Sequence, residues 1–443
     1  MTDRDLRCSR RKFLASAAAL AVATQAKLPA AEPADPHTSF RSRPAKPSLD
    51  GRKPIAVATT VYRPLSHSFH IAGRFLHGYA TDCGFHTPHQ YVHSVYTEQT
   101  PENDLTSDLA REFNFQRAKS ISEALLDGDK LAVEGVLLIA EHGNYPRNEK
   151  GQILYPRWEM FQQIVEAFRK AGRSVPVFCD KHLSYDWKKA KQMVDWSREL
   201  KFPFMAGSSL PVTWRRPELE LPLNAPVEDA LVAAYGPIEV YGFHALEALQ
   251  CMLERRKGGE TGIRAVTCVT GKNVWKAGDS GAWSWDLLDA ALSRSETVCP
   301  GDIRQNVGAF SVQGQPAAPA TAFLIEYRDG TRGTVLLLNG HIQDFVFAAK
   351  VRGESRPASC MFHLPPPPGA RYFDGLVLNI EKLLNNGRSP YPVERTLLTS
   401  GALDYLMTSH FKRGERIETP ELEVRYTATA ESNFLRGSVA PPV

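Results

Sequence analysis

Residues 175–200, VPVFCDKHLSYDWKKAKQMVDWSREL, join an apolar run to a helix-like stretch through three ionisable side chains in a row. The apolar run predicts a strand that ends at residue 179, and residues 185–200 predict a helix. Apolar strands and helices alternate in this way over residues 54–212, which predicts an α/β fold with a doubly wound, parallel, Rossmann-like sheet. We expect its other strands at 55–60, 91–99, 133–143 and 202–209, and its other helices at 66–79, 104–114 and 155–172.

The pattern changes after residue 212. A predicted helix at 243–259 precedes four strands without helices between them, which predicts an α+β domain with a mostly antiparallel sheet. Two further helices, at 376–387 and 393–414, follow. We therefore expect a signal peptide (1–30), a flexible linker (31–53), a Rossmann-like domain (54–212), an α+β substrate or oligomerisation domain (213–425) and a C-terminal tail (426–443).

The first residues indicate export. Residues 8–14, CSRRKFL, precede the short apolar segment ASAAALAVA, a pattern typical of a twin-arginine signal with a small-residue cleavage site. This predicts a periplasmic or otherwise exported protein. Much of the formal net charge of +4 lies in this leader, so nothing favours a nucleic-acid partner, and no apolar run reaches the roughly 18 residues that a membrane span needs.

Polar side chains follow several of the predicted parallel strands. The carboxyl ends of such strands meet at one edge of the sheet, where ligands of doubly wound folds bind. We therefore expect one site at this edge, with a strand-end residue from each of four strands. The candidates are Thr59, Thr60, Arg63, Glu98, Glu141, His142, Asp180, Lys181 and His182.

The run from VLLIAEHG (136–143) through VFCDKHLSYDWKKAKQMVDWSRELKFPFMAGSS (177–209) resembles the Gfo/Idh/MocA family of sugar and polyol dehydrogenases. Asp180-Lys181-His182 stands where that family has Glu-Lys-Pro. Residues 242–247, GFHALE, are similar to the family's Gly-x-His-x-x-Asp helix start. The strand pair around DGTRGTV (329–335) and the segment SGALDYLMTSHFKRG (400–414) also match the family's C-terminal half.

The resemblance implies an oxidoreductase that acts on a carbohydrate or polyol with NAD or NADP. Lys181 would lie beside the nicotinamide and the substrate hydroxyl, His244 would be its acid–base partner, and Asp180 and His182 would complete the catalytic motif. The cofactor would lie against the other strand ends, namely Thr59, Thr60, Arg63, Glu98, Glu141 and His142. Glu247 is a candidate to bind the substrate or to orient His244. Trp214 and Arg215 are candidates to bind the sugar, and packing at the hinge between the two domains is the alternative for them.

Three departures from the family pattern keep other functions open. The loop ATTVYRPLSH (58–67) has no glycine where a dinucleotide site needs Gly-x-Gly-x-x-Gly, Val240 replaces an Asp, and His182 replaces a Pro. The alternatives are a sugar lyase or hydrolase that needs no dinucleotide, and a non-catalytic carbohydrate-binding protein. Lys181 in a structural salt bridge and His244 as a core or capping residue are the corresponding structural readings.

Two further hypotheses concern a metal and self-association. A metal held by Glu141, Asp180, His182 and His244 is an alternative that no short ligand spacing supports. A homo-oligomer that forms through the C-terminal sheet is an expectation based on the exposed face such a sheet would have.

Overall fold

The computed structural model describes residues 48–81, 84–309 and 317–437. The predicted signal peptide, residues 31–47 of the predicted linker and residues 438–443 of the predicted tail lie outside these ranges. None of the helices in the described ranges is long and apolar enough to cross a lipid bilayer.

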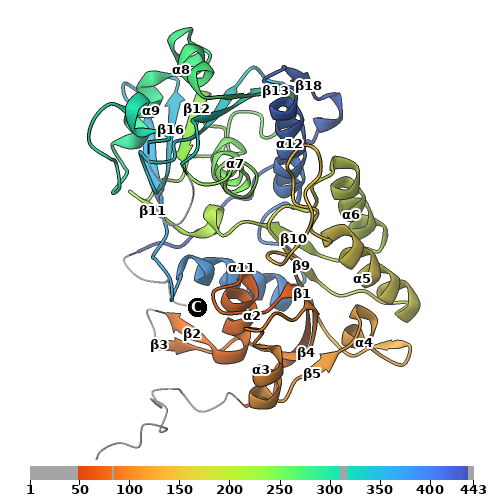
Figure 1. The fold of residues 1–443 in the computed structure, drawn as a ribbon. Helices are drawn as coiled ribbons and strands as arrows, with labels where there is room; N and C mark the ends of the chain where they lie inside the picture. Colours follow the sequence, from red (N-terminus) through yellow and green to blue (C-terminus); the bar gives the residue numbers. More distant parts are fainter. Residues whose placement is uncertain (1–47, 82–83, 310–316, 438–443) are drawn as a thin grey trace, which may run out of the picture. The chain divides into compact units, whose positions relative to one another are not determined.

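Six parallel strands form the first sheet, in the order β10-β9-β8-β1-β4-β5 (Figure 1). The predicted parallel sheet is thereby confirmed. Because strands are added on opposite sides of β1, a crevice forms at the carboxyl ends of β1 and β8. The strands are β1 (Lys53–Val61), β4 (Gln90–Gln99), β5 (Gln116–Ala118), β8 (Val136–Ile139), β9 (Val177–Asp180) and β10 (Phe204–Gly207).

Helices cover both faces of this sheet because its strands are apolar on both sides. Along β1, Ala56 and Ala58 pack with α4, α5 and α6, whereas Ile55 and Val57 pack with α2 and α11. Figure 1 shows α11, from late in the chain, beside α2. The helices are α2 (His67–His77), α3 (Thr106–Phe113), α4 (Ile121–Leu125), α5 (Arg157–Ala171), α6 (Trp187–Glu199) and α11 (Tyr372–Asn386), and two small hairpins are β2 (Tyr79–Thr81) with β3 (Gly84–His86) and β6 (Leu126–Asp127) with β7 (Lys130–Leu131).

Eight strands form the second sheet, in the order β11-β17-β16-β12-β15-β14-β13-β18. The pair β12–β15 is parallel and the other pairs are antiparallel, so the predicted mostly antiparallel sheet is confirmed. The central strand β12 is absent from the sequence-based prediction. The strands are β11 (Trp214–Arg216), β12 (Val227–Ala234), β13 (Ile263–Thr270), β14 (Thr321–Tyr327), β15 (Arg332–Leu337), β16 (Phe345–Val351), β17 (Ala358–His363) and β18 (Ile417–Glu418).

Helices also lie on both faces of the second sheet. Ala230, Val232 and Ala234 of β12 pack in the cluster of α7 and α12, and Leu231 and Ala233 pack in the cluster of α8 and α9. The expected self-association through a bare sheet face therefore stays a prediction that would have to involve α8, α9 or the sheet edges. The elements are α7 (Val240–Leu253), α8 (Lys272–Asp279), α9 (Trp285–Leu292), α10 (Ile303–Asn306), α12 (Glu394–Phe411), η1 (Leu210–Val212) and η2 (Pro420–Leu422).

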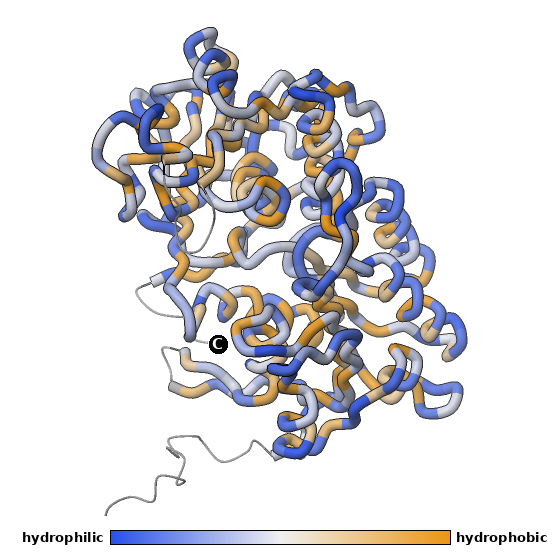
Figure 2. Tube along the Cα trace, viewed as in Figure 1, coloured by the Kyte–Doolittle hydropathy of each residue, from blue (hydrophilic) through white to orange (hydrophobic). Residues whose placement is uncertain are grey.

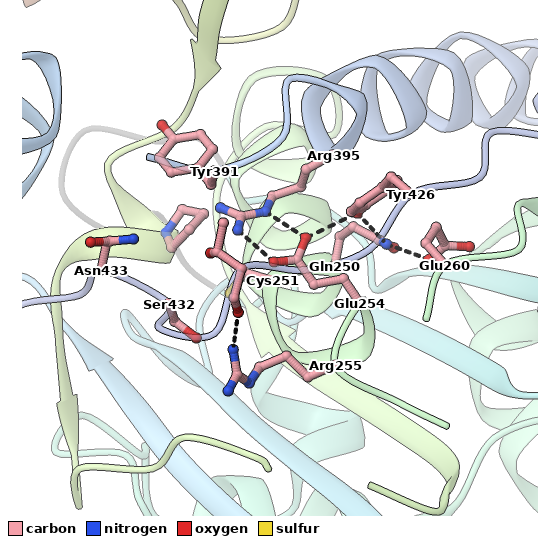
Figure 3. A network of polar contacts seen from close by, with 12 residues as sticks. Gln250, Cys251, Glu254, Arg255, Glu260, Tyr391, Arg395, Tyr426, Ser432 and Asn433 are labelled. Carbon is pink, nitrogen blue, oxygen red and sulfur yellow. Dashed lines mark hydrogen bonds and ion pairs between the residues drawn. The ribbon is translucent and has the colours of Figure 1, made fainter. Parts of the chain in front are cut away.

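Helix α7 carries His244 near its start and is fixed at its other end by buried charges. Figure 2 shows α7 mostly in hydrophobic colours, as expected for a helix surrounded by protein. Glu254, directly after α7, accepts hydrogen bonds from Arg395 of α12 at 2.8 and 2.5 Å and from Tyr426 Oη at 3.0 Å (Figure 3). Gln250 Nε2 donates to Glu260 Oε2 at 2.5 Å in the same network. These bonds hold α7 against α12.

We expect Arg395→Met to lower the free energy of unfolding by about 3–5 kcal/mol, because it leaves the carboxylate of Glu254 buried without its cation. Lys412→Met, in the exposed pair with Glu415 just after the same helix, is the control and should change it by at most about 1 kcal/mol. Urea unfolding followed by circular dichroism measures both. Equal effects of the two substitutions would contradict a structural role for the Arg395–Glu254 pair.

Candidate functional site

Two strand ends at the carboxyl edge of the first sheet have strained backbone. His142, after β8, has φ 70°, and Lys181, directly after β9, has φ 66°. This left-handed conformation costs an L-residue about 1–3 kcal/mol and persists where the surroundings impose it, often at functional sites. Lys181 N donates to Gly207 O at 3.1 Å, which ties the strained residue to the end of β10.

Lys181 has a buried carboxylate partner. Its Nζ lies 3.3 Å from Glu141 Oε1 and 3.4 Å from Val240 O, and 3% of its side chain is exposed. Arg157, from the first turn of α5, donates to the other oxygen of Glu141. Burial by itself would raise the pKa of Glu141, but Lys181 and Arg157 outweigh it and hold the pKa well below its ordinary value. The carboxylate is therefore ionised and fixes both cations.

Three histidines of the site are neutral at pH 7. Burial, with His67 second, lowers the pKa of His142 to about 4. Burial also lowers the pKa of His182 and of His244 far below the ordinary value, helped by Arg157 and by Lys181 respectively. A buried imidazole next to a cation cannot easily take a proton, so these side chains serve as neutral hydrogen-bonding groups.

Hydrogen bonds hold the rings of two of these histidines, and the one to His182 fixes which of its nitrogens accepts. His182 Nε2 lies 3.3 Å from Arg157 Nη1, which can only donate, so this nitrogen is the acceptor. His244 Nδ1 lies 2.6 Å from Ser208 Oγ. The carboxylate of Glu247 accepts from Ser208 N at 3.3 Å, so Glu247 supports the serine and does not itself bond the histidine.

His67 differs from these three because it has a carboxylate partner. It is the first residue of α2, and its Nδ1 lies 2.6 Å from Asp180 Oδ2. Asp180 is 1% exposed, and the imidazole is 16% exposed. The rings of His142 and Phe373 meet the imidazole edge-on, with centroids at 5.1 and 5.2 Å. The ring is thus held on several sides.

These residues surround a cavity of about 320 Å³, which we call the sheet-edge cavity. It is bounded by the strand ends of the first sheet, the start of α7, β16 and the first turn of α11. Aromatic rings make up much of its wall, which suits the apolar faces of a sugar ring. Its walls include His67, Glu141, His142, Lys181, Ser209, Tyr235, Val240, Tyr241, His244, Phe345, Phe362, Tyr372 and Phe373.

The structure brings part of the predicted site together. Lys181, His244, Glu141 and His142 line the sheet-edge cavity. Asp180 and His182 are buried and contact cavity or neighbouring side chains from behind, through His67 and Arg157 respectively. Their roles in binding or catalysis remain predictions.

The predicted sugar-binding residues lie elsewhere. Arg215 is 1% exposed and donates to Leu219 O at 2.8 Å, with its guanidinium 4.1 Å from the ring of Phe434. Trp214 is buried, and its ring lies beside the guanidinium of Arg371. None of these side chains, nor Glu247, lines the sheet-edge cavity.

The described residues contain no group of three or more His, Cys, Asp or Glu side chains placed to hold a metal ion. The four residues of the metal hypothesis have other partners. Glu141 binds two cations, Asp180 binds His67, His182 faces Arg157 and His244 bonds Ser208. This geometry gives the metal hypothesis no support.

Several residues at or directly behind the cavity were not predicted. His67 lies in the predicted helix 66–79, but nothing local indicates which way its ring faces. Arg157 follows a proline at the start of α5, and a basic residue at this place in a sequence does not indicate a functional site. Tyr372 and Phe373 come from α11, and their distance in sequence from the strand ends gave no signal.

The end of β1 does not fit a dinucleotide. Thr59 and Thr60 are fully buried, and their hydroxyls lie 2.9 Å from Ile139 O and from Glu141 O respectively. A dinucleotide site instead has glycines here, which let the pyrophosphate approach the backbone. The two threonine side chains instead bond to β8 and to the loop after it.

The first turn of α2 is also occupied. Ser66 Oγ accepts the N–H groups of Arg63 and of Phe69, each at 3.2 Å, and Pro64 has no N–H to donate. The free N–H groups of a helix start are what binds a pyrophosphate in this fold. Arg63 is partly exposed in this loop.

The loop after β8 bonds to the end of β4 and packs on the end of β1, at the carboxyl edge of the sheet. Asn144 N donates to Gln99 Oε1 at 2.9 Å, Gln99 Nε2 donates to Asn144 O at 3.2 Å, and Tyr145 Oη donates to Glu98. A Cβ on Gly143 would lie 3.3 Å from Val61 Cγ2, so this loop packs on the end of β1. Glu98 thus bonds a tyrosine of its own chain at the position where a cofactor was predicted.

Known proteins resemble this chain in its fold. No family model and no curated protein matches the chain. GenD2 from gentamicin A biosynthesis, in complex with NAD, superposes with a TM-score of 0.51 and 15% identity over 85% of this chain and 99% of that chain. A probable dehydrogenase from Thermotoga maritima gives 0.50 and 12% over 83% and 99%, and myo-inositol 2-dehydrogenase from Lactobacillus plantarum gives 0.49 and 11% over 83% and 99%. The described part of the chain therefore has the fold of the Gfo/Idh/MocA-type dehydrogenases, a parallel sheet followed by a mostly antiparallel one, as its sequence resemblance predicts.

Proposed function

We propose that this chain is an enzyme that acts on a small carbohydrate or polyol by acid–base chemistry in the sheet-edge cavity, without a bound dinucleotide. One observation carries the proposal: the ammonium of Lys181 is buried at the wall of an aromatic-lined cavity and held there by Glu141. A fixed cation in a site of low polarity stabilises negative charge that develops on a substrate oxygen. His244, neutral and bonded to Ser208, is placed to hydrogen-bond a hydroxyl.

The size and charge of the cavity support a small neutral ligand. At about 320 Å³ it lies at the lower end of the range of ligand pockets, about 300–1,000 Å³, so it suits a monosaccharide better than two nucleotides. The buried charges of Lys181 and Arg157 are balanced by Glu141 and Asp180. The cavity wall therefore offers hydrogen bonds but has no excess of positive charge that would attract an anion.

A second candidate is a nicotinamide-dependent oxidoreductase that acts on the same class of substrate. The fold favours it, as does the place of Lys181 and His244, which matches the reactive positions implied by the family resemblance. GenD2, which shares the fold, binds NAD. Two features count against this candidate. Buried threonine side chains occupy the end of β1, and the loop after β8 packs on it.

We also propose export by the twin-arginine route. The proposal rests on residues 8–14 and the apolar segment after them, which lie outside the described residues.

We expect Lys181→Met to lower kcat by about 10²–10³-fold, because it removes the charge that faces the developing oxyanion. Glu141 keeps Arg157 as its partner, so the fold should survive. Conversion of neutral monosaccharides and polyols is followed by NMR, with Lys188→Met on the exposed face of α6 as the control. Full activity of Lys181→Met with unchanged circular dichroism would refute the assignment of the site.

We expect purified protein to release no nicotinamide absorbance on denaturation and to show no saturable fluorescence change with NADH or NADPH. The control is retention of sugar binding by the same sample, which shows that the cavity is intact. Stoichiometric dinucleotide binding would reject the cofactor-free proposal and favour the oxidoreductase.

We expect residues 1–53 fused to a folded reporter to direct it out of the cytoplasm of a bacterium, and Arg10→Lys with Arg11→Lys to abolish this transport. Cell fractionation measures the reporter. Transport that does not depend on the two arginines would contradict the twin-arginine assignment.

A further inference from the structure

We propose that His67 and Asp180 form a proton-transfer dyad in which His67 removes a proton from the carbon next to a carbonyl group of a small sugar. This inference rests on the proposed function and adds its general base and its class of reaction. It concerns a residue at the start of α2, in the place where this fold otherwise binds a pyrophosphate.

The hydrogen bond between the two side chains determines the state of the imidazole. A carboxylate can only accept, so the proton at the 2.6 Å contact lies on His67 Nδ1. In the neutral ring the lone pair is then on Nε2, for which the described residues provide no hydrogen-bond partner. Since His67 lines the cavity and Nδ1 faces Asp180, Nε2 is the atom available to a ligand. This is the arrangement of a base whose ring is oriented, and stabilised when protonated, by a buried carboxylate.

The other histidines of the site have no such hydrogen-bonded carboxylate. His142, His182 and His244 have no carboxylate within hydrogen-bonding distance, and burial disfavours their protonated forms. His182 lies beside the guanidinium of Arg157 and His244 beside the hydroxyl of Ser208. Among the histidines at or directly behind the cavity, His67 is the one that a negative charge prepares to accept a proton.

Lys181 complements the dyad on the same cavity wall. When Nε2 of His67 takes the proton, the electron pair of the C–H bond becomes the C=C bond of an enolate, and the carbonyl π pair moves onto oxygen. The ammonium of Lys181 faces that oxygen and stabilises its charge. Return of the proton from Nε2 to carbon restores the carbonyl, so no oxidant or reductant is consumed.

The reaction class follows from what the site contains. Oxidation of an alcohol needs an acceptor for two electrons, and the place where a dinucleotide would lie is filled by residues 59–66 and 141–145. A base and a fixed cation can move protons without such an acceptor. The carbon acid that a single cation serves best is one whose charge is carried by a neighbouring carbonyl oxygen.

The test uses the full chain in D₂O with D-fructose, D-tagatose, D-psicose and L-sorbose as probes. We expect loss of the proton NMR signals at the carbons beside the carbonyl of at least one probe. His67→Ala should slow this exchange by about 10²–10⁴-fold, the usual contribution of a general base, while sugar binding stays within a few-fold. His89→Ala, an exposed histidine of the same domain, is the control and should exchange like the wild type.

Asp180 acts through His67 and is a positioning residue, so it needs a separate readout. Asp180→Asn can donate as well as accept and should place the proton on Nε2 in part of the molecules. We expect kcat for exchange to fall with KM unchanged, and ¹⁵N NMR to show a changed tautomer of His67. An unchanged tautomer with full exchange would remove Asp180 from the proposal.

The outcomes separate this inference from the proposed function. If the wild type converts a sugar without taking up deuterium, or if His67→Ala keeps the exchange, the dyad is overturned. The proposed function survives that result as long as Lys181→Met still stops the conversion. If no sugar is bound or converted by the wild type, the proposed function fails and this inference fails with it.

Discussion

The site depends on the two ion pairs that the carboxylate of Glu141 forms with Lys181 and Arg157. Glu141 is buried just after β8, beside the point where the strand order of the first sheet reverses. Its negative charge compensates the positive charges of Lys181, at the end of β9, and Arg157, at the start of α5. Two buried cations without it would each be left with a large desolvation cost. Because both cations must reach one carboxylate, the ends of β8 and β9 and the first turn of α5 are held together. Burial, with Arg157 second, lowers the pKa of His182 well below its ordinary value.

The proposed function and the shared fold differ in what the carboxyl edge of the first sheet binds. GenD2, which shares this architecture, was solved in complex with NAD. Here the threonines at the end of β1, the capped start of α2 and the loop after β8 bond to other parts of the chain. Aromatic rings line the sheet-edge cavity beside the start of α7. On the proposed function, this edge of the sheet holds one small ligand.

The sequence predicts those parts of the fold that a local pattern encodes. Five of the six strands of the first sheet follow from hydrophobic runs, and β5, which is three residues long, does not. The charged triplet at 180–182 could be placed at the sheet edge because carboxyl ends converge. β12 was missed because it is buried on both faces and lies between proline-rich segments without a clear period. Arg215 was misplaced because, in a strand of three residues, sequence does not fix which side faces a cleft, and here Phe434 receives it. The place of His67 in the site could not be predicted, because its partner Asp180 lies 113 residues away in the sequence.

Helix α11 has a consequence for how the protein matures. Its rings at Tyr372 and Phe373 close the sheet-edge cavity, and its apolar face covers one side of a sheet whose strands all come from the first half of the chain. A growing chain that ends before residue 372 would leave that face of the sheet uncovered and the cavity without a wall. On the proposed function, ligand binding is therefore a late event in synthesis, because the cavity lacks this wall until residue 373 has been made.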